Sequence, residues 1–213
     1  MDNLKKAFAS KLLKIKAIKL QPNNPFTWAS GWKSPFYCDN RKTLSYPELR
    51  NYVKLELVHA ILDRFPEVEA IAGVATGAIP QGALVADALN LPFVYVRSKP
   101  KDHGLENLIE GELKPGMKVV VVEDLISTAG SVLEVVSVLR DAGVEVLGVV
   151  SIFTYGMSKG FARLQDAGVR NISITNFDVI AQVAAEEGYI AKEDVRRLIA
   201  FRDHPDDEGW RDL

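Results

Sequence analysis

Apolar and polar positions alternate along this chain in a way that predicts a mixed α/β protein. Short runs rich in Val and Ile predict strands at residues 69–74, 92–96, 119–122, 145–153 and 171–175. Apolar residues at helical spacing predict helices at residues 4–15, 47–65, from about 80, 132–139, 158–167, 179–187 and 191–201. Strands that alternate with helices at this spacing indicate a parallel sheet that is covered by helices on both faces.

Two segments lie outside this regular pattern. Residues 21–46 are rich in proline and aromatic residues and predict mostly loop with a short hairpin. Residues 97–116 are polar and contain three glycines, so they predict a mobile binding loop. We find no internal repeat and predict one domain over residues 1–213, in which residues 1–46 form a hood over the strand ends.

The most informative segment runs from Val119 to Ser131. Its four consecutive valines predict a buried central strand that ends at the acids Glu123 and Asp124. A loop of small and hydroxylated residues follows, and then a helix. Ligands of open α/β sheets bind at the carboxyl ends of strands, and free backbone N–H groups at a helix start favour a phosphate there. Acids beside such a loop can accept hydrogen bonds from sugar hydroxyls, so the segment predicts a site for a phosphorylated sugar.

This segment resembles the phosphoribosyl pyrophosphate (PRPP) signature of the type I phosphoribosyltransferases over all of its positions. It lacks the lysine of the G-x-x-x-x-G-K-[ST] loop and the glycine spacing of G-x-G-x-x-G, so those nucleotide loops do not fit. Glu123 stands in the first acidic position, where Asp is more frequent. The resemblance implies a type I phosphoribosyltransferase-like fold and PRPP binding by Glu123, Asp124, Leu125, Ile126, Ser127, Thr128, Ala129, Gly130 and Ser131.

A second turn of small residues, Gly73–Gly82, follows the strand at 69–74. By itself such a glycine-containing connection indicates no ligand. Beside the PRPP-like segment it becomes the natural place for the pyrophosphate, bound by the backbone N–H groups of Thr76 and Gly77. In the type I phosphoribosyltransferases this turn is the pyrophosphate loop, so the resemblance covers two separated segments.

A third cluster is cationic and opens the predicted mobile loop. Arg97, Lys99, Lys101 and His103 occupy every second position, so in an extended backbone Lys101 and His103 project to the same side. Such a run is often only a solvated loop. A pyrophosphate leaving group, however, needs cations that meet its charge as it departs. We therefore assign all four residues to PRPP binding, and interpret Arg97, Lys101 and His103 as catalytic together with Asp124.

Two segments narrow the resemblance to the orotate phosphoribosyltransferases. The pattern Arg-x-x-x-Lys-x-His-Gly at 97–104 resembles their catalytic loop, and Phe26–Arg41 resembles their S-G-x-x-S-P-x-Y hood. The resemblance implies that PRPP and orotate are converted to orotidine 5′-monophosphate and pyrophosphate, in pyrimidine biosynthesis. It also implies Mg²⁺, held mainly through PRPP with Asp124 as the candidate protein ligand. A homodimer is implied as well, in which the lysine–histidine loop reaches into the partner subunit's site.

Three positions depart from the family's pattern. Ala29 stands where many members carry an orotate-contacting lysine. Tyr155 lies in the segment where many carry an orotate-binding arginine, and Ser98 replaces a second lysine of the catalytic loop. The carboxylate of orotate must therefore meet a different cation.

Our candidates for that cation are Lys33 and Arg41 of the hood segment. As charged residues on a predicted loop, both fit equally well as ordinary solvated side chains. We expect the backbone groups near Phe36 and the hydroxyl of Ser127 to contact the orotate ring.

Composition limits the class of protein. The 213 residues are 47% hydrophobic, and 26 Lys and Arg against 28 Asp and Glu give a net charge of −2. Proteins that bind nucleic acid usually have a basic excess, so that class is disfavoured. The single cysteine, Cys38, excludes an internal disulfide and suits a reducing cytosol. No apolar stretch has the length of a membrane span, so we expect a cytoplasmic protein without a membrane or nucleic-acid partner.

Two alternative functions remain open. A phosphoribosyltransferase for another base, such as a purine, is kept open by Ala29 and Tyr155. A regulatory protein of the same fold would sense PRPP or a nucleotide and bind RNA or protein without turnover. Such a regulator would not need the loop that carries Lys101 and His103.

Overall fold

The computed structural model describes residues 3–28, 31–97 and 108–213. Its centre is a six-stranded sheet of order β10-β9-β8-β5-β6-β7, in which all neighbours are parallel except β6 and β7. The strands are β5 (Ala70–Val74), β6 (Phe93–Val96), β7 (Ile109–Glu110), β8 (Lys118–Ile126), β9 (Glu145–Thr154) and β10 (Asn171–Asn176). The predicted parallel sheet is confirmed.

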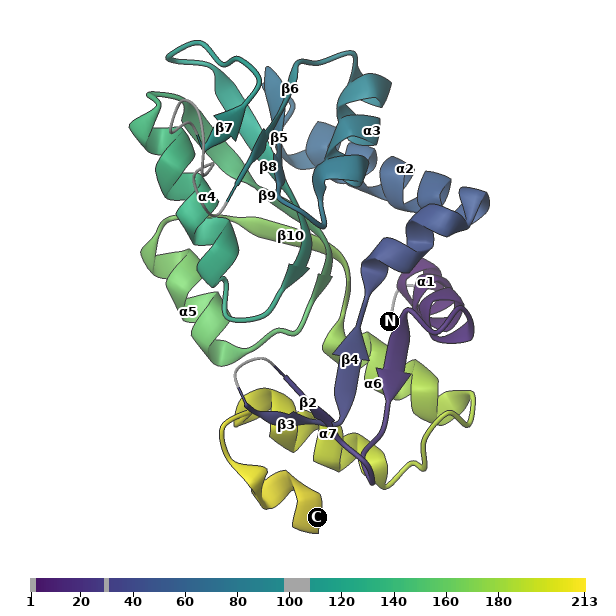
Figure 1. Cartoon of the computed structure of the whole chain (residues 1–213). Helices are drawn as coiled ribbons and strands as arrows, with labels where there is room; N and C mark the ends of the chain where they lie inside the picture. Colours follow the sequence, from purple (N-terminus) through teal and green to yellow (C-terminus); the bar gives the residue numbers. More distant parts are fainter. Residues whose placement is uncertain (1–2, 29–30, 98–107) are drawn as a thin grey trace.

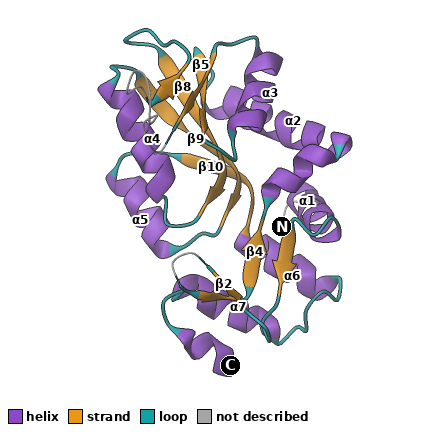
Figure 2. Ribbon diagram, in the orientation of Figure 1, coloured by secondary structure: helices purple, strands orange, loops and turns teal. Residues whose placement is uncertain are grey.

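Helices cover both faces of this sheet (Figures 1 and 2). On one face lie α2 (Pro47–Arg64) and α3 (Ile79–Leu89), and on the other lie α4 (Gly130–Asp141) and α5 (Ser158–Asp166). Each buries an apolar stripe against the strands, which is why the helical spacing of the sequence located them. In the part of the chain that the structure describes, none of the helices has the length and apolar character needed to cross a bilayer.

Two small sheets lie beyond the carboxyl ends of the parallel strands (Figure 1). One pairs β1 (Ile18–Leu20) with β4 (Phe36–Cys38), and the other pairs β2 (Phe26–Thr27) with β3 (Lys33–Ser34). The predicted hairpin is therefore confirmed as β2–β3. The 3-10 helix η1 (Asn40–Ser45) follows β4, so residues 21–46 are more regular than predicted.

The remaining helices come from both ends of the chain: α1 (Asn3–Lys14), α6 (Phe177–Glu186), α7 (Asp194–Asp203) and the 3-10 helix η2 (Glu208–Asp212). Figure 1 shows α6 and α7 beside the small sheets. Helix α1, which belongs to the predicted hood, packs against α6 and β10. The division of the chain into a hood and a single domain stays a prediction.

Aromatic rings join the small sheets to the main sheet. The ring of Phe36 is fully buried and stacks on that of Phe153 in β9, with 5.5 Å between the centroids. It also lies 4.8 Å from the ring of Phe177 in α6. Trp28 packs edge-on against Tyr155 at 5.2 Å. The N-terminal segment, the main sheet and the C-terminal helices thus share one apolar cluster.

Strand β8 is longer than predicted, and this changes the setting of the acid pair. The strand was expected to end before Glu123, but it continues to Ile126 because β9 pairs with it throughout that stretch. Strand β5, on its other side, pairs with β8 only as far as Val122. The two acids therefore lie inside a strand that has a neighbour on one side only.

Two other boundaries also differ from the prediction. The expected loop at 97–116 contains β7, because Ile109 pairs with Val96 at the sheet edge. The closing helix was expected to begin at Ala191, but α7 begins at Asp194, and η2 beyond it was not predicted.

Candidate functional site

The acid pair of β8 lies at the carboxyl end of the main sheet. Glu123 is buried, and its Oε1 accepts a 2.7 Å hydrogen bond from the backbone N–H of Asp124. Burial raises the pKa of Glu123 to about 8 and that of Asp124 to about 6. At neutral pH Glu123 is therefore mainly protonated and able to donate a hydrogen bond, whereas Asp124 is mainly anionic.

Replacing Glu123 by glutamine is expected to raise the free energy of unfolding, and to raise it most at high pH. The carboxyl titrates near 4.5 in the unfolded chain and near 8 in the folded one, so the folded state binds more protons in this window and loses stability as pH rises. Glutamine does not ionise, so the variant should gain about 1–3 kcal/mol at pH 8 and little at pH 5. Chemical denaturation at both pH values measures this, with Glu134→Gln on the surface of α4 as the control. An equal change at both pH values would contradict the prediction.

The pyrophosphate turn touches Asp124. Strand β5 lies next to β8, so the turn that follows β5 reaches the same end of the sheet. A Cβ atom at Gly77 would lie 2.6 Å from Oδ2 of Asp124, which leaves room for glycine alone. Thr76, the other residue predicted to bind pyrophosphate, lies beside it in the same turn. The structure thus brings together the two separated segments of the PRPP resemblance.

The predicted phosphate loop is short and spans Ser127–Ala129, between the end of β8 and the start of α4. Ala129 has a left-handed backbone (φ 60°), a conformation that non-glycine residues rarely adopt. Among the described residues, the backbone N–H groups of Ser127, Thr128, Ala129 and Gly130 donate to no acceptor. Four donors at a helix N-terminus suit a phosphate group.

Helix α5 supports this loop, a feature that the sequence analysis missed. Nη1 of Arg163 donates a 3.2 Å hydrogen bond to the carbonyl oxygen of Thr128. A Cβ atom at Gly160 would overlap the carbonyl oxygen of Ser127, so α5 packs directly on the loop backbone. The only signal in the sequence is that Gly160 and Arg163 are three positions apart and share a helix face.

Arg97 lies at the base of the loop predicted to carry the catalytic cations. Its backbone N–H donates a 2.9 Å hydrogen bond to the carbonyl of Leu108, and its Nη1 lies 3.6 Å from Oε1 of Glu110. These contacts bring the two ends of the loop together. The other predicted cations lie outside the described residues, and their roles stay predictions: Lys99, Lys101 and His103.

The two candidate cations for orotate differ in their surroundings. Nζ of Lys33 donates a 2.8 Å hydrogen bond to Oγ1 of Thr27 within the β2–β3 hairpin. Arg41 is exposed, and its Nε donates a 2.6 Å hydrogen bond to Asp39. The positive charge of Arg41 also acts to lower the pKa of Asp124. Arg41 therefore interacts electrostatically with the acid pair.

The backbone N–H and carbonyl groups of Phe36 already form hydrogen bonds within the N-terminal segment. Its carbonyl accepts hydrogen bonds from Oγ of Ser34 (2.7 Å) and Nε1 of Trp28 (3.3 Å), and its N–H donates to Oγ of Ser34 (3.1 Å). Its ring belongs to the aromatic cluster, as does that of Tyr155. A contact from the Phe36 backbone to orotate stays a prediction, and Ala29 lies outside the described residues.

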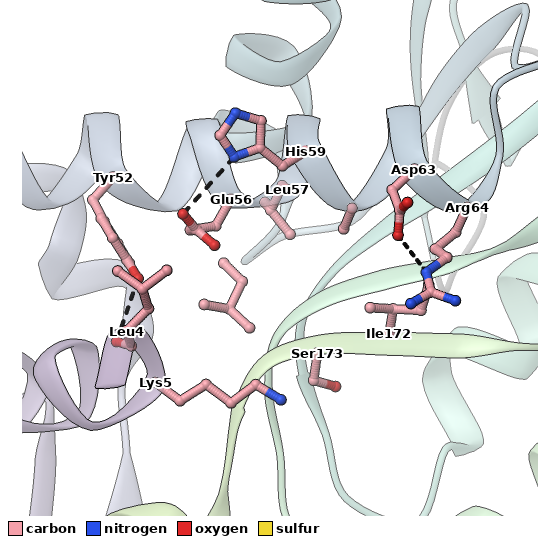
Figure 3. Close-up of a pocket in the computed structure, with 12 residues that line it drawn as sticks. Leu4, Lys5, Tyr52, Glu56, Leu57, His59, Asp63, Arg64, Ile172 and Ser173 are labelled. Atoms are coloured by element: carbon pink, nitrogen blue, oxygen red, sulfur yellow. Dashed lines mark hydrogen bonds and ion pairs between the residues drawn. The ribbon is translucent and has the colours of Figure 1, made fainter. Parts of the chain in front are cut away.

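Two of the cavities on the surface differ in their relation to the predicted site. One of about 580 Å³ lies between α5 and the ends of β9 and β10, where Ser127 meets apolar side chains such as Met157 and Phe161. The other, of about 400 Å³, lies between α1, α2 and β10 (Figure 3). His59 and Glu56, which are neighbours on α2, lie 4.0 Å apart at its wall, and it is lined by residues other than the predicted site residues.

Comparison with known proteins assigns this arrangement to a family. A family model, "Phosphoribosyl transferase domain", matches residues 59–187. An orotate phosphoribosyltransferase of Bacteroides thetaiotaomicron is 66% identical over 205 residues, which cover 96% of this chain and 97% of that protein. The chain belongs to the orotate phosphoribosyltransferase family. It is therefore an enzyme of the phosphoribosyltransferase class, as the motifs predicted.

Solved structures agree with this assignment. Orotate phosphoribosyltransferase from Aeropyrum pernix superposes with a TM-score of 0.74 at 28% identity, over 86% of this chain and 99% of that one. UMP synthase of Leishmania donovani superposes with a TM-score of 0.78 at 26% identity, over 93% of this chain. The chain spans 42% of the length of that second protein. The similarity therefore covers most of this chain in both comparisons.

Proposed function

We propose that the protein transfers the 5-phosphoribosyl group from PRPP to orotate, giving orotidine 5′-monophosphate and pyrophosphate. The observation that carries this proposal is the contact between the pyrophosphate turn and the acid pair, at Gly77 and Asp124. One ligand with a pyrophosphate on one side and ribose hydroxyls on the other would span both segments. The identity of 66% to a relative named for orotate supports the choice of base.

Three groups of residues bind PRPP in this proposal. The 5′-phosphate lies in the loop Ser127–Ala129 and at the start of α4, where backbone N–H groups and the hydroxyls of Thr128 and Ser131 are donors. Asp124 accepts hydrogen bonds from the ribose hydroxyls, and protonated Glu123 can donate one. The turn after β5 receives the pyrophosphate.

The reaction breaks the bond between the anomeric carbon and the pyrophosphate oxygen, and forms one from that carbon to the ring nitrogen of orotate. The proton of that nitrogen is acidic and passes to water or to the departing pyrophosphate. Positive charge develops on the ribose as the first bond lengthens, and the anionic Asp124 stabilises it. Arg97, Lys101 and His103 meet the negative charge on the departing pyrophosphate. The loop that carries them excludes the water that would otherwise hydrolyse PRPP.

We propose Mg²⁺ as the cofactor. Oδ1 of Asp124 is buried and has no hydrogen-bond partner in the described part of the chain, so it fits a hard cation. Such an ion prefers oxygen ligands and keeps several waters, so one carboxylate and the oxygens of PRPP suffice to hold it. When bound, Mg²⁺ supplies positive charge that partly neutralises the pyrophosphate.

We also propose a cytoplasmic homodimer in which the lysine–histidine loop reaches the partner's site. The resemblance of residues 97–104 to the family's catalytic loop supports the shared site, and the single Cys38 supports a reducing compartment. Sedimentation of the purified protein measures the oligomeric state. Recovery of activity on mixing two different inactive variants would show that sites are shared.

The first experiment follows the near-ultraviolet absorbance of orotate with purified protein, PRPP and Mg²⁺. We expect a loss of orotate absorbance that needs both PRPP and Mg²⁺, because turnover removes free orotate. Parallel assays replace orotate with uracil, adenine, hypoxanthine and guanine. Turnover of a purine without turnover of orotate would keep the PRPP site and overturn the base assignment. PRPP binding without turnover of any base would favour the regulatory alternative.

A further inference from the structure

The N-terminal segment reaches the acid pair through one side chain, Asn40 at the start of η1. Asn40 is only 1% exposed, and its Nδ2 donates a 3.0 Å hydrogen bond to the backbone carbonyl of Asp124. Its Oδ1 accepts a 3.3 Å hydrogen bond from Sγ of Cys38. Oγ1 of Thr43 donates a 2.6 Å hydrogen bond to the backbone carbonyl of Asn40. Because both ends of the amide are occupied, its orientation is fixed.

This hydrogen bond takes the place of a strand pairing that Asp124 lacks. Strand β5 pairs with β8 only as far as Val122, so Asp124 lies beyond the last paired residue on that side. The donor that its carbonyl receives comes instead from Asn40, which is 84 positions away in the sequence. The carboxylate of Asp124 lies against Gly77. Asn40 thus fixes the backbone of Asp124, and its amide also acts on the carboxyl group, whose pKa it helps to lower. Gly77 of the other segment bounds the same side chain.

We infer that Asn40 is a positioning residue, which holds Asp124 in the place where its carboxylate meets the ribose of PRPP. This inference rests on the proposed PRPP site. A purely structural reading is that the amide satisfies a buried carbonyl and stabilises the fold without affecting the ligand. The two readings differ in whether the effect of Asn40 on PRPP depends on the Asp124 carboxylate.

A double-mutant cycle between Asn40 and Asp124 separates these readings. In the wild-type background, we expect Asn40→Ala to weaken the binding of PRPP with Mg²⁺ by about tenfold, measured by calorimetry. We expect almost no further weakening by Asn40→Ala in an Asp124→Ala background, because the carboxylate that it positions is absent there. The value of kcat/KM for PRPP should fall in parallel in the wild-type background.

Ser34→Ala is the matched control for loss of a buried polar group in the same segment. The hydroxyl of Ser34 is buried and bonds to Phe36 without reaching β8. We expect this variant to lower the melting temperature and to leave the affinity for PRPP within about twofold of the wild type.

Two results would overturn the inference. One is an unchanged affinity for PRPP in Asn40→Ala, and the other is the same weakening in both backgrounds. If Asn40→Ala does not fold, Asn40→Leu replaces it in the cycle, because it has a similar volume and loses the N–H donor without adding a charge beside Asp124. Binding of PRPP is measured without a base. The cycle can therefore be interpreted even if orotate proves not to be the substrate.

Discussion

The Lys101→Ala variant is expected to turn over orotate about 10²–10³ times more slowly than the wild type, with less than about tenfold loss of affinity for PRPP. A cation that meets the pyrophosphate as it departs interacts more strongly with the transition state than with bound PRPP. Its removal therefore lowers kcat more than it weakens binding. The absorbance of orotate gives kcat, and calorimetry gives the dissociation constant for PRPP.

Lys114→Ala is the control for this variant. Lys114 is an exposed lysine between β7 and β8, near the end of the same predicted loop, and it is not among the predicted site residues. Its loss therefore tests the general effect of removing one positive charge there. We expect turnover within about twofold of the wild type for that variant. Equal losses of affinity and turnover in Lys101→Ala would mean that Lys101 only binds ground-state phosphate.

The order of the elements could be predicted from local patterns. The four valines of β8 indicate a buried strand because no polar residue interrupts them, and Pro47 marks the start of α2 because proline fits the first helical turn. The two segments proposed to bind PRPP could be located because they resemble the family's motifs. A turn of small residues after a buried strand would by itself have indicated no ligand.

The surroundings of the acid pair could not be predicted in this way. How far β8 extends past Val122 depends on how far β9 runs beside it, and local sequence does not contain that information. The raised pKa of Glu123 could not be predicted either, because burial raises it and burial depends on how the surrounding elements pack on the end of the strand.

Single polar residues that act at a distance were also missed. Asn40 was noticed only as part of a motif, and Arg163 only as part of an amphipathic helix. Their partners are 84 and 35 positions away, so the fold alone brings them together. The role of Phe36 stays a prediction, because the packing of its ring in the aromatic cluster does not test a contact from its backbone to orotate.

The Gly77→Ala variant is expected to lose about 1–3 kcal/mol of PRPP binding free energy, which is roughly a 5- to 150-fold loss of affinity. The added Cβ atom would lie 2.6 Å from Oδ2 of Asp124, closer than such atoms approach, and 3.0 Å from its Cβ, which is a tight contact. Either the carboxylate rotates away or the pyrophosphate turn shifts. Both responses separate the two segments that PRPP must span. Calorimetry with PRPP and Mg²⁺ measures the loss.

The clash also predicts how the two positions depend on each other. In an Asp124→Ala background most of the obstructing atoms are gone, so Gly77→Ala should cost less free energy of unfolding than it does in the wild type. Gly209→Ala, in η2, is the control, since a Cβ atom there meets only the flexible carboxylate of Asp207 at 3.2 Å. If Gly77→Ala bound PRPP as tightly as the wild type, the turn and Asp124 could move apart without loss of PRPP binding. Their contact would then no longer support a single ligand that spans both segments.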